Sequence, residues 1–389
     1  MMRLILRVIL VSLFLGSIAL PANAALSSAS IPAVFDELLK NQRLANPAMV
    51  VIDGSTGQLV YEKNGFSQRK PASVMKLLTA AATIQHLDVQ STFNTTININ
   101  PEIKTVIIRG SFDPWISLDH KTARKMSRAS LPFMGFETLK GVKARNDGSL
   151  KNYDVIYSNL YSQDVANLKS FWSKRGFKPT FKSVSDDETF VAMGEQIVSE
   201  NSPTVAAIID WILLWSDNLI SERLARLSAK AAGYPMSSKG VDRVFRDVLE
   251  GMQIDATKLV VADASGLSRK NKITAKLMAE FLYKIRLDEK YSVIYSGLPI
   301  GGVSGTLKTR FITTAPVAVG LVRAKTGTLN GTATLAGYVQ STDREYVFVT
   351  LADEIPSGNT ALKRARDAID RVLGRIAAPN IPAEISSAS

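Results

Sequence analysis

The chain has 389 residues, with 47 Lys and Arg against 35 Asp and Glu, two His and no Cys. The lack of cysteine excludes disulfides, a thiol nucleophile and cysteine-based metal sites. His86 and His120 alone do not easily build a Ser-His-Asp triad or a zinc site, so we expect no cofactor and no metal. The net charge of +12 favours anionic surroundings. For an exported chain these are cell-wall polymers or a membrane surface, met by peripheral contact, rather than nucleic acid.

Residues 1–24 have the pattern of a signal peptide. Arg3 and Arg7 accompany an apolar run over residues 4–20, and Pro21-Ala-Asn-Ala24 follows it. We therefore expect export to a periplasmic or other extracytoplasmic, cell-wall-associated location, with cleavage after Ala24. The apolar run is short for a membrane-spanning helix. Retention of this segment as a membrane anchor is the alternative.

Residues 49–61 predict a β-hairpin that turns at 53–57. A helix then starts near Pro71 and carries a Ser-x-x-Lys pattern, Ser73 and Lys76. Residues three apart are neighbours on a helix, so the Lys76 amine can lie close enough to take the hydroxyl proton of Ser73. This pattern is also common on ordinary helix surfaces, but its apolar neighbours here favour a buried lysine.

A lysine that acts as a base must be a neutral amine. Lowering a lysine pKa from about 10.4 to near 7 corresponds to roughly 4–5 kcal/mol of differential stabilisation. Burial and a second nearby cation are the usual means, and Lys325 is the candidate cation. The backbone N–H of Ser73, at a helix start, could also donate to a developing oxyanion.

Residues 91–194 are interpreted as an inserted accessory subdomain. They alternate strand-like pieces, such as 104–109 and 153–157, with an amphipathic helix near 163–174. The basic run 121–128 could be a docking patch, although such runs are more often solvated faces.

The second motif, Ser216-Asp-Asn218, interrupts a helical stretch near 203–232. An unpaired buried polar group costs about 1–3 kcal/mol, so these residues need partners. A position between two lysines would satisfy the Ser216 hydroxyl, which could then carry a proton to a leaving amine. The Asn218 amide could orient Lys76 and a substrate backbone. The alternative is a helix cap, because Ser, Asp and Asn favour that position. Both interpretations can hold together.

The rest of the chain predicts helices near 238–252 and 273–286, a set of strands around the third motif, and a last helix near 358–376. The strands are expected at 322–329, 332–340 and 345–351, antiparallel, with a turn at 341–344.

The third motif, Lys325-Thr-Gly327, lies in the first of these strands. A glycine within a strand marks a close approach, here expected from a substrate chain added along the sheet edge. Lys325 and Thr326 would meet a substrate carboxylate, and Gly327 and Thr328 would line the same strand of the substrate site. The Thr328 N–H could join that of Ser73 in an oxyanion hole.

The order Ser-x-x-Lys, Ser-x-Asn, Lys-Thr-Gly resembles the penicillin-recognising serine enzymes. Flanking strings narrow the resemblance: NSPTVAAI from Asn201, SDNLISE from Ser216, DASGLSR from Asp263, LPIGGVSGTLKTR from Leu298 and AKTGTL from Ala324. Together they are similar to the D-alanyl-D-alanine carboxypeptidase/endopeptidase family of penicillin-binding protein 4 type, peptidase family S13.

This resemblance implies an α+β fold of the DD-peptidase/β-lactamase type, with an antiparallel sheet flanked by helices and a reduced accessory insertion. The catalytic domain would comprise residues 25–90 and 195–389. Peptidoglycan stem peptides ending in D-Ala-D-Ala would acylate Ser73, D-alanine would leave, and water would hydrolyse the acyl-enzyme. β-Lactams would acylate the same serine as inhibitors. The expected catalytic residues are Ser73, Lys76, Ser216, Asn218 and Lys325.

The spacing of the first two motifs departs from this family. The 143 positions from Ser73 to Ser216 are fewer than its typical large insertion requires, so part of the accessory architecture is expected to be missing. Endopeptidase activity on cross-linked peptides, which would depend on that architecture, is therefore the least direct expectation. The same gap is too long for a compact class A β-lactamase, and Glu250 lacks the asparagine partner expected of its deacylating glutamate.

Two other functions stay open on sequence alone. One is a serine esterase or D-amino-acid amidase of the same fold, which would turn over simple esters but not D-Ala-D-Ala peptides. The other is a non-catalytic cell-wall-binding protein, which would fail to bind a penicillin covalently. The presence of all three motifs argues against the second.

Overall fold

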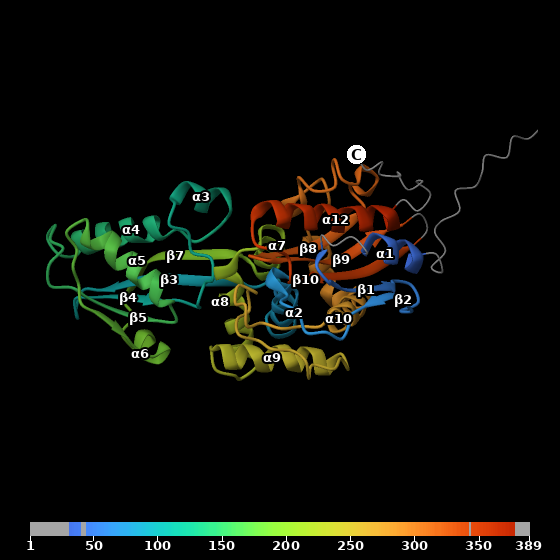
Figure 1. The fold of residues 1–389 in the computed structure, drawn as a ribbon. Coiled ribbons are helices and arrows are strands. Elements are labelled where there is room, and N and C mark those ends of the chain that lie inside the picture. Colours follow the sequence, from blue (N-terminus) through green and yellow to red (C-terminus); the bar gives the residue numbers. More distant parts are fainter. Residues whose placement is uncertain (1–30, 40–43, 342–343, 378–389) are drawn as a thin grey trace, which may run out of the picture.

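Two five-stranded sheets organise the protein, whose structure is a computed structural model describing residues 31–39, 44–341 and 344–377. The sheets lie at opposite ends of an elongated molecule, and the termini of the described chain lie beside the first sheet (Figure 1). The expected signal peptide over residues 1–24 lies outside the described residues.

The first sheet is antiparallel throughout and has the order β2-β1-β10-β9-β8. Its strands are β1 (Ala48–Asp53), β2 (Leu59–Lys63), β8 (Val322–Leu329), β9 (Thr332–Gln340) and β10 (Glu345–Ala352). The hairpin and the three C-terminal strands that the sequence predicts are therefore confirmed. Strand β8 is at one edge of the sheet, and it carries the Lys-Thr-Gly motif.

Helices cover both faces of this sheet (Figure 1). One face packs against α1 (Ile31–Leu39) and α12 (Asn359–Ala377), and the other against the larger helical layer. That layer contains α2 (Lys76–His86), α7 (Val205–Trp215), α8 (Asn218–Ala231), α9 (Ser238–Gly251), α10 (Ala275–Leu287) and the short α11 (Ser292–Gly297). Because both faces are covered, the three inner strands β1, β9 and β10 are buried at nearly every position, and all six residues of β1 are buried. This is the predicted α+β arrangement.

The second sheet is mixed and has the order β6-β5-β4-β3-β7. Its strands are β3 (Thr92–Asn100), β4 (Thr105–Arg109), β5 (Asp154–Ser158), β6 (Phe181–Ser183) and β7 (Glu195–Thr204). Strands β4, β5 and β6 run parallel, whereas β3 is antiparallel to β4 and β7. The accompanying helices are α3 (His120–Lys125), α4 (Leu131–Ala144), α5 (Ser162–Ser173) and α6 (Asp186–Val191). A separate apolar core joins this sheet to α4 and α5.

The boundary of the insertion differs from the sequence interpretation. Strand β7 pairs with β3 from Glu195 to Thr204, so these residues belong to the second sheet rather than to the catalytic unit that was expected to resume at 195. The pairing was not visible in the sequence because β7 is rich in polar residues and closes the sheet with a partner about a hundred positions earlier.

The insertion packs against the helices that carry the second motif. Trp115 lies against Trp211 of α7 with ring centroids 4.8 Å apart, and Arg223 of α8 donates to the Pro114 carbonyl oxygen at 3.2 Å. The same Arg223 pairs with Asp164 of the insertion at 3.0 Å. The second sheet is therefore anchored next to the motif segment 216–218. Within the described ranges, no helix is both long and apolar enough to cross a membrane.

Candidate active site

Lys76 lies at the centre of a group of polar contacts drawn from three distant segments. Its Nζ is 3.0 Å from Ser73 Oγ, 2.7 Å from Asn218 Oδ1 and 2.6 Å from the Ser265 carbonyl oxygen. The Ser73 contact arises because a short 3-10 helix, η2 (Ala72–Met75), runs directly into α2. The predicted pairing of Ser73 with Lys76, and of Lys76 with Asn218, is therefore present.

Burial sets the protonation of Lys76. Its side chain has no exposed surface, and burial lowers its pKa from 10.5 to about 8, although Asp263, Asp217 and Glu222 act in the opposite direction. This shift corresponds to about 3 kcal/mol of differential stabilisation of the neutral form. At pH 7 roughly one Lys76 in ten is then a neutral amine, compared with fewer than about one in a thousand for an ordinary lysine. Lys76 is thus a candidate base.

Lys325 of β8 is equally buried and faces the same helical layer. Burial and the charge of Lys76 hold the Lys325 pKa well below its usual value. Its Nζ donates to the Thr326 carbonyl oxygen at 3.2 Å. The sequence analysis predicted that Lys325, as a nearby cation, would help to lower the Lys76 pKa. In the structure the Lys76 shift comes from burial, whereas the charge of Lys76 lowers the pKa of Lys325.

The second motif is a helix junction as well as a contact of Lys76. Ser216 ends α7 in the left-handed conformation, with φ of 63°, and Asp217 caps α8 by accepting a hydrogen bond from the Ile220 N–H at 3.0 Å. Asn218 is the first residue of α8 and reaches Lys76. Both interpretations of this motif therefore apply. Among the described residues, no hydrogen bond joins the Ser216 hydroxyl to Lys76 or Lys325.

The outer edge of β8 is open next to the nucleophile segment. At the start of the strand, the Gly301 N–H donates to the Val322 carbonyl at 2.8 Å, and the Ala324 N–H donates to the Pro299 carbonyl at 3.0 Å. Alternate residues of a strand direct their backbone groups to the same edge, so the N–H groups of Thr326 and Thr328 point outward as well. The Thr328 N–H is thus directed away from the sheet, as an oxyanion-hole donor requires.

Gly327 allows β8 to pack against the segment that precedes Ser73. A Cβ atom at Gly327 would lie 2.1 Å from Thr334 Oγ1, 2.9 Å from the Pro71 carbonyl oxygen and 3.0 Å from the Ala72 Cβ. The Thr334 hydroxyl also donates to the Pro71 carbonyl at 2.8 Å. The glycine was expected to mark the approach of a substrate. In the structure, the approaching group is the protein's own chain.

The backbone around Ser73 is held in an unusual conformation from both sides. Ala72 has a positive φ of 48°, which is costly for a residue with a Cβ. Gly266 packs onto it so closely that a Cβ there would lie 1.8 Å from the Ala72 carbonyl oxygen. Such a conformation persists only when its surroundings enforce it, so the position of Ser73 depends on these contacts.

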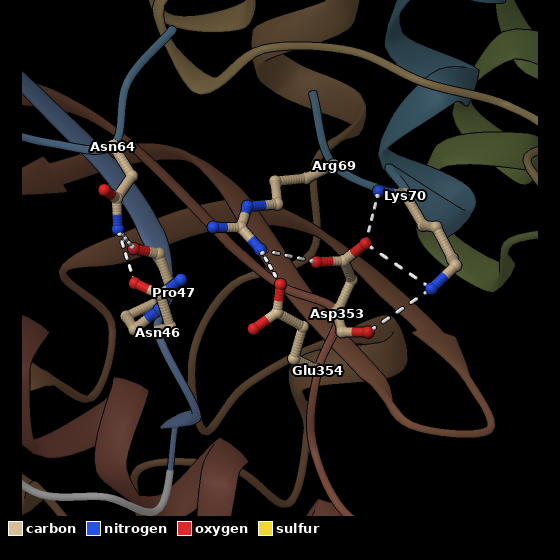
Figure 2. A network of polar contacts seen from close by, with 7 residues as sticks. All are labelled: Asn46, Pro47, Asn64, Arg69, Lys70, Asp353 and Glu354. Atoms are coloured by element: carbon tan, nitrogen blue, oxygen red, sulfur yellow. Dashed lines mark hydrogen bonds and ion pairs between the residues drawn. The ribbon is translucent and has the colours of Figure 1, made fainter. Parts of the chain in front are cut away.

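Ion pairs fix the chain just before this segment, as Figure 2 shows. Arg69 Nη1 lies 3.2 Å from Asp353 Oδ1 and 2.6 Å from Glu354 Oε1. The Lys70 N–H donates to Asp353 Oδ2 at 3.1 Å, and its Nζ approaches the same carboxylate at 3.5 Å. These contacts tie residues 69–70 to the end of β10, and thereby hold the nucleophile segment against the first sheet.

Two residues that the sequence analysis did not single out orient Lys76. Glu222 Oε1 accepts hydrogen bonds from the N–H groups of Ala264 and Ser265, both at 2.8 Å, and the Ser265 carbonyl then accepts from Lys76. Glu222 and Asn218 are four residues apart on α8, so one helix supports two acceptors of the lysine. The segment DASGLSR contributes to the family resemblance, but its residue types do not indicate that the backbone carbonyl of Ser265 is the functional group.

Within residues 31–39, 44–341 and 344–377, no three His, Asp or Glu side chains are grouped so that they could hold a metal ion.

The chain is similar to known proteins along most of its length. The model of the D-Ala-D-Ala carboxypeptidase 3 (S13) family matches residues 32–152 and 153–376. A carboxypeptidase DacB of Mycolicibacterium smegmatis is 27% identical over 381 residues, which span 85% of this chain and 82% of that protein.

Solved structures show the same fold at lower identity. Penicillin-binding protein 4 of Haemophilus influenzae superposes with a TM-score of 0.69 at 18% identity, over 88% of this chain and 98% of that one. A penicillin G-acylated predatory endopeptidase of Bdellovibrio bacteriovorus superposes with a TM-score of 0.58 at 16% identity, over 86% and 92% of the two chains. The protein described here belongs to the D-Ala-D-Ala carboxypeptidase 3 (S13) family of peptidases.

Proposed function

We propose that this protein is a serine D-Ala-D-Ala carboxypeptidase that trims peptidoglycan stem peptides through an acyl-enzyme on Ser73. The observation that carries the proposal is the 3.0 Å contact between Ser73 Oγ and a fully buried Lys76 whose pKa is lowered to about 8. A serine hydroxyl is a weak nucleophile until an adjacent base accepts its proton. Membership of the carboxypeptidase family supports the choice of substrate.

In the acylation step, Ser73 Oγ forms a bond to the carbonyl carbon of the penultimate D-alanine while its proton passes to Lys76 Nζ. The carbonyl oxygen becomes an oxyanion, which the N–H groups of Ser73 and Thr328 stabilise. Two preorganised donors of this kind typically contribute about 10²–10³ in rate each. The intermediate then collapses and the peptide C–N bond breaks.

The leaving amine of D-alanine must gain a proton. Lys76 now carries one, and the Ser216 hydroxyl, on the half-buried junction beside Asn218, is the relay that would pass it on. Burial of Lys76 is what makes its neutral, basic form accessible near neutral pH. In the second half of the cycle, a water attacks the acyl carbonyl carbon and gives a proton to Lys76. The ester bond to Ser73 Oγ then breaks, Oγ takes that proton back from Lys76, and the shortened peptide leaves.

The same chemistry accounts for inhibition by β-lactams, whose strained amide would acylate Ser73 and remain bound. The structural relative acylated by penicillin G supports this expectation through its shared fold. Cross-linked peptides are the second candidate substrate, because a cross-link ends in the same D-alanyl carbonyl. The bond cleaved would differ only in its leaving amine.

The decisive experiment is the intact mass of the full chain after incubation with a β-lactam, with Ser73→Ala as the comparison. We expect one adduct per chain, absent from the variant. An adduct that persists in Ser73→Ala would place the nucleophile elsewhere. A parallel assay measures D-alanine release from a stem pentapeptide and from a cross-linked dimer, which separates carboxypeptidase from endopeptidase activity.

The alternatives give different outcomes in the same assays. A same-fold esterase or D-amino-acid amidase would form the adduct and hydrolyse simple esters but release no D-alanine from the pentapeptide. A non-catalytic wall-binding protein would form no adduct at all. Binding of purified cell wall without turnover would then be its signature.

We also propose that the chain is exported and acts next to the cell wall. The proposal rests on the signal-peptide pattern over residues 1–24 and on the net charge of +12, which suits an anionic polymer or membrane surface. Cell fractionation followed by N-terminal sequencing is the test. A mature chain beginning at Ala25 supports it, whereas an intact N-terminus in the membrane fraction would indicate a retained anchor.

A further inference from the structure

A guanidinium group lies beside the motif strand at its open edge. Arg366 of α12 donates from Nη2 to Thr328 Oγ1 at 2.9 Å. Thr328 is exposed at the end of the Lys-Thr-Gly-Thr stretch, and Arg366 is partly buried. The side chains of β8 alternate between the two faces of the sheet, so Thr328 faces α12 while Lys325 faces the opposite helical layer.

Arg366 has no ion-pair partner among the residues that the structure describes. The two acids nearest to it along α12 are occupied by other cations. Asp370 is buried and pairs with Arg310, and Asp367 pairs with Lys363 at 2.8 Å. The backbone carbonyl of Arg366 itself accepts from Arg310 at 3.3 Å, which brings a second positive charge close.

This environment favours an external anion. A guanidinium stays charged in proteins, and partial burial of this charge without an ion pair is costly. Burial and the neighbouring Arg310 lower the Arg366 pKa, and the charges of Asp370 and Asp367, which act in the opposite direction, do not reverse the shift. An anion bound here would relieve this cost.

The other cation of the motif is not available for direct contact. Lys325 has no exposed surface, and its Nζ is engaged by the Thr326 carbonyl. A ligand at the β8 edge would therefore meet Thr326, Thr328 and Arg366 first. Thr326 is itself fixed by a hydrogen bond between its hydroxyl and that of Thr306, at 2.8 Å.

We propose that Arg366 binds the C-terminal carboxylate of the substrate together with the hydroxyl of Thr328. The inference rests on the proposed function. In a peptide that ends one residue after the scissile bond, this carboxylate lies at most about 3.6 Å further along the chain than the carbonyl that is attacked. The Thr328 N–H is the expected oxyanion donor, so a carboxylate one residue further on comes within reach of a guanidinium bound to the Thr328 side chain.

Arg366 would then distinguish a carboxypeptidase substrate from an internal peptide bond. A guanidinium can hold a carboxylate with two parallel hydrogen bonds, which are stronger than bonds between neutral groups. A substrate whose last residue is amidated, or continues into a longer chain, offers no charge for this contact. Arg366 is therefore a specificity residue for the free carboxyl terminus.

The test compares two substrates and four proteins. The substrates are an N-acylated peptide ending in D-Ala-D-Ala and the same peptide with a C-terminal amide. The proteins are the wild type, Arg366→Ala, Arg366→Lys and, as a matched control, Arg364→Ala, which removes an exposed arginine from the same helix. For the free acid, we expect kcat/KM to fall about 10- to 100-fold in Arg366→Ala and by less in Arg366→Lys. Arg364→Ala should match the wild type.

A second readout covers the case of slow amide turnover. The rate of Ser73 acylation is followed by intact mass with a penicillin and with its methyl ester, which lacks the carboxylate. Arg366→Ala should slow acylation by the free acid only. Equal rates in Arg366→Ala and the wild type, or an equal loss on acid and ester, would overturn the inference. A wild type that neither acylates nor releases D-alanine would instead refute the proposed function.

Discussion

The catalytic unit and the inserted unit differ in the burial and pairing of their positively charged side chains. In the catalytic unit, Lys76 and Lys325 are fully buried and neither forms an ion pair with a carboxylate among the described residues. In the inserted unit, partly exposed arginines pair with more exposed acids, as in the pairs Arg109–Asp186 and Arg145–Glu195.

The difference follows from the layers around each sheet. Helices on both faces of the first sheet exclude water from the lysines, whereas the inserted sheet builds its apolar core mainly with α4 and α5. Burial of an unpaired ammonium is costly, so it is expected only where the lowered pKa is used. The catalytic unit thus carries a cost in stability that the insertion does not.

The largest effect is expected from removal of the buried Lys76 amine. Lys76→Met should reduce acylation by at least about 10³-fold, because the nucleophile loses its base. The same change should remove the burial penalty of the charge. The variant is therefore expected to be at least as stable as the wild type at pH 7, although Asn218 and the Ser265 carbonyl lose a donor.

The direction of the Lys76 pKa shift determines how this stability difference changes with pH. The Lys76 pKa is about 8 in the folded protein and near 10.5 when unfolded, so between these values the unfolded chain binds more protons. The free energy of unfolding of the wild type then rises with pH across this window. Chemical denaturation should show the advantage of Lys76→Met to be largest below pH 8 and to shrink towards pH 10.5. An advantage that grows with pH would contradict the assignment.

A second prediction concerns the contact between β8 and the nucleophile segment. Gly327→Ala places a Cβ 2.1 Å from Thr334 Oγ1, which the bond to the Pro71 carbonyl holds in place. We expect a loss of about 1–3 kcal/mol in the free energy of unfolding from overpacking, together with a large loss of acylation. Gly251→Ala is the control, since nothing lies within 4 Å of its Cβ position. Wild-type acylation by Gly327→Ala would show that the close approach is not needed.

The third prediction removes the negative charge of Glu222 but keeps a side-chain oxygen that can accept the same hydrogen bonds. Glu222→Gln keeps an oxygen that can accept from Ala264 and Ser265 but removes a negative charge that raises the Lys76 pKa. The acylation rate should rise with pH through the Lys76 pKa of about 8 in the wild type, and its midpoint should move to lower pH in the variant. Glu250→Gln, on the exposed side of α9, should leave the midpoint unchanged. A midpoint that moves to higher pH would rule out this electrostatic role.

The smallest effect is expected in the insertion. Arg145→Ala removes a pair whose acid, Glu195, is largely exposed. Surface pairs of this kind contribute about 0–1 kcal/mol, so the unfolding free energy should change by no more than that, and acylation by a β-lactam should be unaffected. A loss of acylation in this variant would mean that the two units are coupled more tightly than their separate cores suggest.

Much of the fold followed from local patterns. The β-branched and aromatic content predicted the hairpin and the three C-terminal strands, and apolar runs predicted most helices. The second sheet was harder to predict because its pairing is not local. Strand β3 pairs with β7, which lies about a hundred residues later in the chain. Strands β4, β5 and β6 are parallel, so no hairpin turn in the sequence indicates their pairing.

Residue spacing was enough to predict the catalytic groups: a serine and a lysine one helical turn apart, an amide in a helix junction and a lysine on an edge strand. Spacing on a helix or strand fixes which side chains are neighbours. Tertiary structure alone decided the rest. Burial of both lysines, the Ser265 carbonyl as an acceptor, the packing of Gly327 on Pro71 and the contact of Arg366 with Thr328 all join segments far apart in the chain. Backbone carbonyls and long-range packing leave no residue pattern, because any amino acid presents the same carbonyl and burial depends on the whole fold.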